Sequence, residues 1–139
     1  MTGIYHAHSG VRYLVLLLGI VAIVLYLYKF LARRPATRGD RILMTVLTGA
    51  VDLQVLLGLI LVVGGIFYGA LMGHLLMMLL ALVALHAASV LARRSTDDRR
   101  THGIRLGGIL LSLVLVVGGI MAIRRTPLSS GPPSVEAAP

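Results

Sequence analysis

Four long apolar runs dominate the pattern of hydrophobic and polar positions along the chain. A membrane-spanning helix needs about 20 mainly apolar residues, and each run is long enough. Arg-rich segments separate the first run from the second and the third from the fourth, whereas a short turn at "FYGALMG" joins the second and third. We therefore predict helices at about 10–31, 42–67, 70–92 and 104–123.

These runs predict the fold class, an all-α integral membrane protein with four transmembrane helices in an up-down-up-down bundle. The bundle domain is expected over residues 1–125. The tail over residues 126–139, "TPLSSGPPSVEAAP", is expected to be flexible because it is rich in Pro, Ser and Ala. The start of the chain does not resemble a cleavable signal, because no basic segment precedes the first apolar run and "LARRP" follows it.

The ends of the runs resemble one another in pairs. "FLARR" ends the first run and "VLARR" the third, while "LGLILVVGGI" and "LLSLVLVVGGI" end the second and fourth. This pattern is consistent with two repeated hairpins in the same orientation. Chance matches between apolar segments are the alternative explanation, so a duplication remains a hypothesis.

Composition favours lipid over water as the solvent of this chain. It is 58% hydrophobic and 13% charged over 139 residues, more apolar surface than a soluble domain of that length can bury. The absence of cysteine excludes disulfides, iron–sulfur clusters and thiolate metal sites. We find no signature of a phosphate-binding loop, a catalytic nucleophile or a nucleic-acid-binding surface, so nucleic acid is not an expected partner.

The positive charges predict the orientation in the membrane. Ten of the thirteen lie in the two Arg-rich segments, at positions 29, 33, 34, 38, 41, 93, 94, 99, 100 and 105. By the positive-inside rule both segments are cytoplasmic and both termini are outside. We therefore expect a multi-pass protein of the bacterial inner membrane, with the net charge of +8 reflecting topology.

Two histidines are candidate cofactor ligands near the outer surface. Counted outward from Lys29 and Arg93, His8 and His74 reach depths that differ by only about 3 Å. The glycine pairs at 64–65 and 118–119 are expected in the same layer. Two axial imidazoles and small residues at the edges of a macrocycle are what a b-type haem between helices requires.

Arg12 lies one turn below His8, where it could neutralise a haem propionate. The alternative is that these histidines are ordinary interfacial residues and that the glycines are packing surfaces. His6 and His102 are expected to be solvated.

A second polar group is expected deeper in the membrane. Asp52 and Gln54 lie near the middle of the second run, and His86 lies about 6 Å from Asp52 in depth. Ionisable residues in hydrocarbon usually face the bundle and have a partner, so we predict a buried polar pair of Asp52 and His86 with Gln54 beside it. Such a pair could relay protons, bind a quinone head or orient a ligating His86; a packing role is the alternative.

Three segments resemble a group of small bacterial four-helix membrane proteins described as cytochrome-b-like, which are similar to the halves of haem A synthase. They are "HSGVRYLVLL", "LQVLLGLIL" and "GHLLMMLLALVALH". The resemblance implies haem ligation at His8, His74 and His86. This chain differs from the family pattern at one position: the family has a histidine just before the Leu-Gln pair, where this chain has Asp52.

Two functions of different classes are compatible with these residues. The first is a membrane-embedded, b-type haem-binding electron-transfer protein, or a haem-bearing subunit of a respiratory or photosynthetic complex. In it, His8 and His74 would bind the haem iron, and Arg12 and His86 would also contact the cofactor. Quinone is a further candidate cofactor. The second is a non-catalytic accessory subunit that packs against other membrane subunits. The residues leave open whether the chain is an enzyme and favour one that is not an enzyme by itself.

Overall fold

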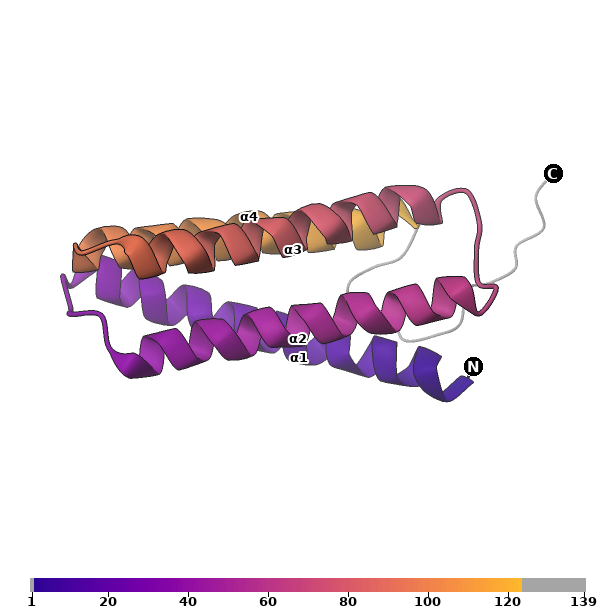
Figure 1. Ribbon diagram of the computed structural model, residues 1–139, viewed down its shortest axis with the longest axis horizontal. Helices are drawn as coiled ribbons and strands as arrows, with labels where there is room; N and C mark the ends of the chain where they lie inside the picture. The colour runs from indigo at the N-terminus through magenta and orange to yellow at the C-terminus, as the bar shows by residue number, and fades with distance from the viewer. Residues whose placement is uncertain (1, 124–139) are drawn as a thin grey trace.

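The computed structural model describes residues 2–123, which form four α-helices and no strands. The helices are α1 (Thr2–Leu31), α2 (Arg38–Val63), α3 (Leu71–Arg94) and α4 (Asp98–Ala122). They run alternately up and down, so the 64–70 turn and the start of α1 lie at one end and the two Arg-rich connections at the other (Figure 1). We name these the short-turn end and the basic end. The tail predicted at 126–139 lies outside the described residues.

Helices α2 and α4 both begin four to six residues before the predicted positions, because polar residues cap them. At the start of α2, Asp40 N–H donates to the Thr37 hydroxyl, and the Asp40 carboxylate accepts from Thr37 N–H at 2.7 Å. This capping box satisfies two main-chain donors that have no partner within the helix. Asp97 caps α4 by accepting from Arg100 N–H at 2.6 Å. The apolar pattern alone could not locate these polar first turns.

At the short-turn end two predicted limits were wrong. Helix α2 ends at Val63 rather than Phe67, because Gly64 is its C-cap and Gly65 follows with φ +97°, a conformation that favours glycine. The 64–65 pair therefore forms a turn and does not present a helix face to a cofactor. Helix α1 begins at Thr2 rather than near Gly10, so His8 lies within a helix.

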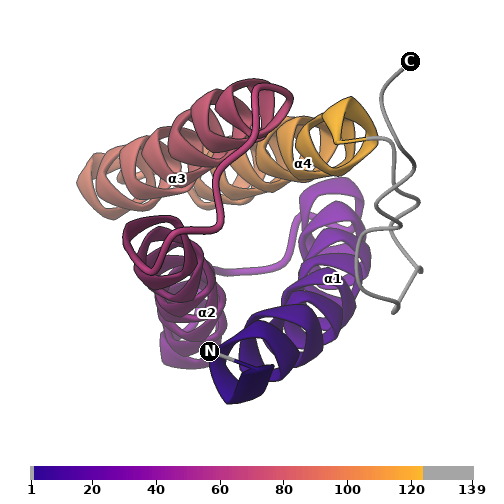
Figure 2. The same cartoon turned by 90° about the vertical axis from the view of Figure 1, so that its right-hand side faces the viewer.

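The four helices form a bundle in which α1 contacts α2 and α4, and α3 contacts α4 and α2 (Figure 2). The closest packing is between α3 and α4, where glycines face small or flexible side chains. A Cβ placed on Gly108 would lie in steric conflict with the Cβ of Ala88, so only glycine allows this approach. The main core includes seven side chains that are almost completely buried: Val15, Ala22, Tyr26, Met44, Leu47, Leu85 and Ile109.

The outward faces of the helices are apolar along their length. Leu17, Val24, Leu79 and Val114 are among the many large apolar side chains that are more than half exposed in the isolated bundle. Water-soluble monomers rarely expose apolar surface on this scale, and all four helices are long and apolar enough to cross a bilayer. The chain is a multi-pass membrane protein whose outer faces contact lipid.

Candidate functional site

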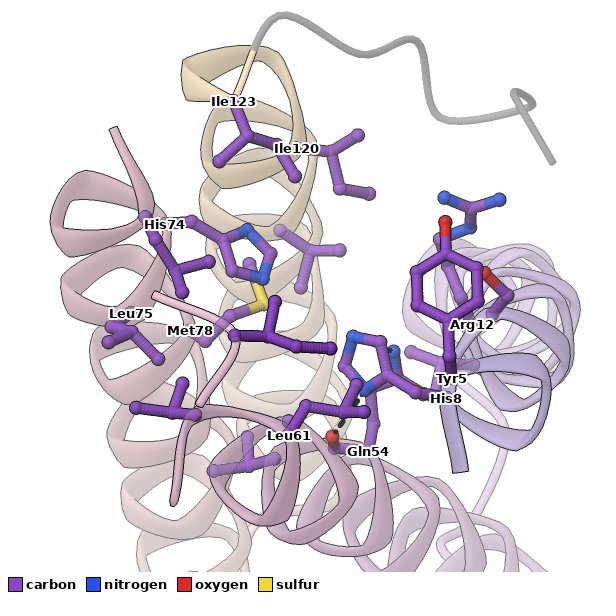
Figure 3. A pocket seen from close by; sticks show the side chains of 18 of the residues that line it. Tyr5, His8, Arg12, Gln54, Leu61, His74, Leu75, Met78, Ile120 and Ile123 are labelled. Carbon is purple, nitrogen blue, oxygen red and sulfur yellow. Dashed lines mark hydrogen bonds between the residues drawn. The ribbon is translucent and has the colours of Figure 1, made fainter. Parts of the chain in front are cut away.

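His8 and His74, which the sequence singled out, line one pocket at the short-turn end (Figure 3). His8 comes from α1 and His74 from α3, so the two rings approach the pocket from helices that lie across the bundle from each other. The open space within the pocket is about 120 Å³. The sequence-based depth argument thus placed both residues at the correct end.

His74 is held by the end of a neighbouring helix. Its Nδ1 lies 3.0 Å from the carbonyl oxygen of Gly119 in α4, one of the last four residues of that helix. Carbonyls at this position lack the main-chain donor of the next turn, so the imidazole supplies the missing hydrogen bond. A carbonyl only accepts, hence Nδ1 carries the proton and Nε2 of the neutral ring is the nitrogen with a free electron pair.

His8 is held in a similar way by α2. Its Nδ1 donates to the main-chain carbonyl of Gln54 at 3.1 Å, and the Gln54 side-chain amide lies 3.3 Å from Nε2 and donates to it. The ring reaches this carbonyl because residue 58, one turn further along α2, is glycine: a Cβ there would lie 3.2 Å from His8 Cε1. The neutral ring again has its electron pair on Nε2.

A bond from Nδ1 to a carbonyl is the usual support of a metal-ligating histidine, because it fixes the tautomer and the orientation of the ring. Both pocket histidines have this support. Residues 2–123 contain no group of three or more His, Cys, Asp or Glu side chains that could hold a metal ion. Two isolated imidazoles suit haem iron better than a free ion, since the macrocycle supplies the other ligands.

Arg12 is buried in the same pocket wall, one turn after His8. Its guanidinium donates to the Tyr13 hydroxyl at 3.1 Å and lies 4.8 Å from the centre of that ring. Arg12 therefore lies beside the pocket, and its role toward a haem propionate stays a prediction.

The rest of the pocket wall is mainly apolar and contains Leu61, Leu75, Met78, Val116 and Ile120. An engineered apolar cavity of roughly 150 Å³ holds a single benzene ring, so the present space has the size of one aromatic ring. The donor set fits a b-type haem, but the macrocycle needs more room than these side chains leave. Haem binding therefore requires these side chains to move, and Met78 has a flexible side chain that can do so.

Asp52 and His86 do form the predicted pair, since His86 Nε2 lies 2.8 Å from Asp52 Oδ1. The prediction that the pair is buried was wrong: 53% of the His86 side chain and 46% of the Asp52 side chain are exposed. The pair bridges α2 and α3 on the outer surface of the bundle. His86 does not line the pocket of His8 and His74, so its predicted ligand role there has no geometric support.

Gln54 was grouped with the wrong partner. It is buried and hydrogen-bonded to His8, whereas Asp52 faces outward. Gly58 was not predicted to take part in the site. The sequence did contain a signal for it, because Gln54 and Gly58 are four residues apart and therefore lie on one face of α2.

A polar cluster at the basic end was also missed. His102, expected to be solvated, is 0% exposed: its ring stacks on Tyr26, and its Nε2 donates to the Arg34 carbonyl at 3.2 Å. Beside it, Lys29 forms an ion pair with Asp40 at 2.6 Å. Capping by Asp97 extends α4 far enough to bring His102 inside the bundle.

Comparison of the chain with protein families, with curated proteins and with solved structures gives no match. Any function assigned to the chain therefore rests on the geometry of the two ends of the bundle.

Proposed function

We propose that the chain is a membrane-embedded protein that binds a b-type haem in the pocket at the short-turn end, with His8 and His74 as axial ligands, and that it serves electron transfer. The observation that carries this proposal is the matched support of the two imidazoles. Each comes from a different helix, lines the same pocket and has Nδ1 on a main-chain carbonyl. Nε2 of His74 is therefore available to a metal, and Nε2 of His8 becomes available once the Gln54 side-chain amide that donates to it turns away.

The residues of the chain would divide the work of such a site. His8 and His74 would hold the iron, and Arg12 would neutralise a propionate. The apolar wall would exclude water, and Gly58 and Gly119 leave room for the rings to reach their carbonyls. A bound haem supplies one-electron transfer.

The test is the visible absorption spectrum of the protein purified from haem-sufficient cells. We expect a Soret band in the parent, its loss in His8→Ala and in His74→Ala, and its retention in His6→Ala and His86→Ala, which alter exposed histidines. A parent protein without a Soret band would refute haem binding. If that colourless protein instead released a quinone on solvent extraction, the pocket would be a quinone-head site, which its present volume suits.

We propose further that the basic end is cytoplasmic and that both termini are outside, as expected for a bacterial inner-membrane protein. The proposal is supported by the Arg and Lys residues within and beside the connections 32–37 and 95–97, which lie at the same end of the bundle (Figure 1). The chain has no cysteine, so single-cysteine variants give an unambiguous signal. Gly69→Cys should react with a membrane-impermeant maleimide from outside intact cells and Thr96→Cys should not; the reverse pattern would overturn the orientation.

An accessory subunit is the second candidate, and the Asp52–His86 pair favours it. Charged groups facing hydrocarbon are costly, so an outward-facing pair near the middle of α2 is better accommodated against another protein than against lipid. Cross-linking at Leu56, an exposed residue one turn from Asp52, tests this candidate. A specific adduct with another membrane protein supports it, and recovery of the uncross-linked chain alone refutes it.

A further inference from the structure

A second pocket, of about 690 Å³, opens at the basic end of the bundle. Its walls come from the first turns of α2, the end of α3 and the start of α4. The charged members are four arginines and one aspartate: Arg38, Arg41, Arg93, Arg105 and Asp98. The hydroxyl-bearing members are Thr37, Thr45, Ser95 and Thr101. The four hydroxyls already donate within the chain, to Asp40, Arg41 and Asp97. The arginines therefore supply the donors and the positive potential that an anion site requires.

Arg105 distinguishes this pocket from an ordinary basic surface. It is only 4% exposed, and its guanidinium lies 5.6 Å from the centre of the Tyr26 ring. Two of its nitrogens, Nε and Nη1, are buried without a hydrogen-bond partner, and no carboxylate of residues 2–123 forms an ion pair with it. Buried donors in native proteins are almost always satisfied, so these two nitrogens point to an acceptor that residues 2–123 do not supply.

The neighbouring carboxylates are already engaged. Asp40 is neutralised by Lys29 and also accepts from the main chain of Thr37. Asp98, in the pocket wall itself, accepts from Ala36 N–H at 3.0 Å. The pocket thus keeps an excess of positive charge that the described residues do not balance.

The rim of the pocket continues into apolar surface along α2. Ile42 and Val46 line the pocket and are about half exposed on the membrane-facing side. A ligand with a phosphate at the arginines and an acyl chain over these two residues would match both parts. Basic pockets between transmembrane helices bind the head groups of anionic lipids in this way.

We infer that this pocket binds the phosphate ester of an anionic phospholipid from the leaflet at the basic end, with Arg105 as its buried contact and Arg41 and Arg93 at its entrance. Phosphate is the shared chemistry of two sources, a lipid head group and a soluble phosphate, and the apolar rim favours the lipid. Lipid binding here does not depend on haem, because the two pockets lie at opposite ends of the bundle.

The test uses the full-length protein in phosphatidylcholine nanodiscs, with its melting temperature followed as phosphatidylglycerol replaces part of the lipid. We expect phosphatidylglycerol to raise the melting temperature of the parent. In the double variant Arg41→Gln/Arg93→Gln we expect about tenfold more phosphatidylglycerol to be needed for the same shift. The matched control is Arg94→Gln/Arg100→Gln, which removes the same charge from exposed arginines outside the pocket and should respond like the parent.

Equal weakening in both double variants would overturn the inference, since a general surface potential would then explain the lipid effect. A full stabilising effect of inorganic phosphate alone, added to pure phosphatidylcholine nanodiscs, would also overturn it by identifying soluble phosphate as the ligand. Because Arg105→Gln alters a buried residue, it is measured second, by mass spectrometry of lipids that co-purify with the folded variant. Retention of phosphatidylglycerol at the parent level would argue against Arg105 as the contact.

Discussion

The two ends of the bundle bury polar groups in opposite ways. At the short-turn end most polar side chains around the pocket are uncharged: two imidazoles are held by main-chain carbonyls, with a glutamine amide beside one of them, and Arg12 is the buried cation among them. At the basic end the buried groups are ionic, with Lys29 bonded to both oxygens of Asp40 and Arg105 stacked near Tyr26. The same four helices thus carry a largely apolar pocket at one end and a cationic pocket at the other.

The difference indicates what each end can bind. A neutral imidazole with one nitrogen bonded to a carbonyl costs little to bury and leaves the other nitrogen for a metal or a hydrogen bond. A buried guanidinium with unsatisfied donors is costly until an anion meets it. The short-turn end therefore suits an apolar cofactor, and the basic end suits a phosphate-bearing ligand.

The largest expected effect comes from removing the ion pair at the basic end. Asp40→Ala leaves the Lys29 ammonium without its partner and removes the carboxylate that accepts from Thr37 N–H in the capping box of α2, so we expect a loss of about 3 kcal/mol in the free energy of unfolding. Denaturant unfolding in detergent measures it. Asp98→Ala, which removes an exposed carboxylate with one main-chain bond, should cost less than about 1 kcal/mol. Equal losses would mean that the basic end is not held by its buried ions.

The next largest loss of stability is expected from a substitution at the interface between α3 and α4, which runs along both pockets. In Gly108→Ala the new methyl group conflicts with Ala88, and we expect a loss of about 2 kcal/mol. The neighbouring Gly107→Ala meets no atom within 4 Å and should be neutral or slightly stabilising. Thermal unfolding of the two variants gives the comparison. Similar melting temperatures would show that the close approach of the helices is not rigid.

A smaller and more local effect is expected at the short-turn end. Gly58→Ala places a methyl group 3.2 Å from His8 Cε1 and should displace the ring from the Gln54 carbonyl. Loss of such a supporting contact typically weakens metal binding, here by about tenfold in haem affinity. Haem titration of the apoprotein measures this. Gly49→Ala in the same helix, where no atom lies within 4 Å, is the control; weakening in both variants would remove the assigned role of Gly58.

The smallest effect should come from the pair on the outer surface. Asp52→Leu removes a half-exposed ion pair, so in detergent we expect a change of less than about 1 kcal/mol. Chemical unfolding of the purified protein checks this. A loss of several kcal/mol would contradict the exposed position of the pair and restore a core role for it.

The sequence predicted the helices, their number and the clustering of arginines at one end, because apolar length and loop charge are local properties. It also placed His8 and His74 at one depth, since helical rise is regular. It could not decide which side of α2 faces inward. Asp52 and Gln54 are two residues apart, about 200° around a helix, so when Gln54 is buried Asp52 must face out. His102 was misplaced because its charged neighbours resemble a loop, and only the cap at Asp97 reveals that α4 already includes them.

Ligation of one haem by both His8 and His74 is tested most directly by electron paramagnetic resonance of the oxidised, haem-loaded protein and of His74→Met. We predict a low-spin signal of two imidazoles in the parent. In the variant we predict mixed imidazole and thioether coordination with a higher reduction potential, as a methionine ligand confers. An unchanged two-imidazole signal in His74→Met would contradict ligation by His74, because the second ligand would then be another residue.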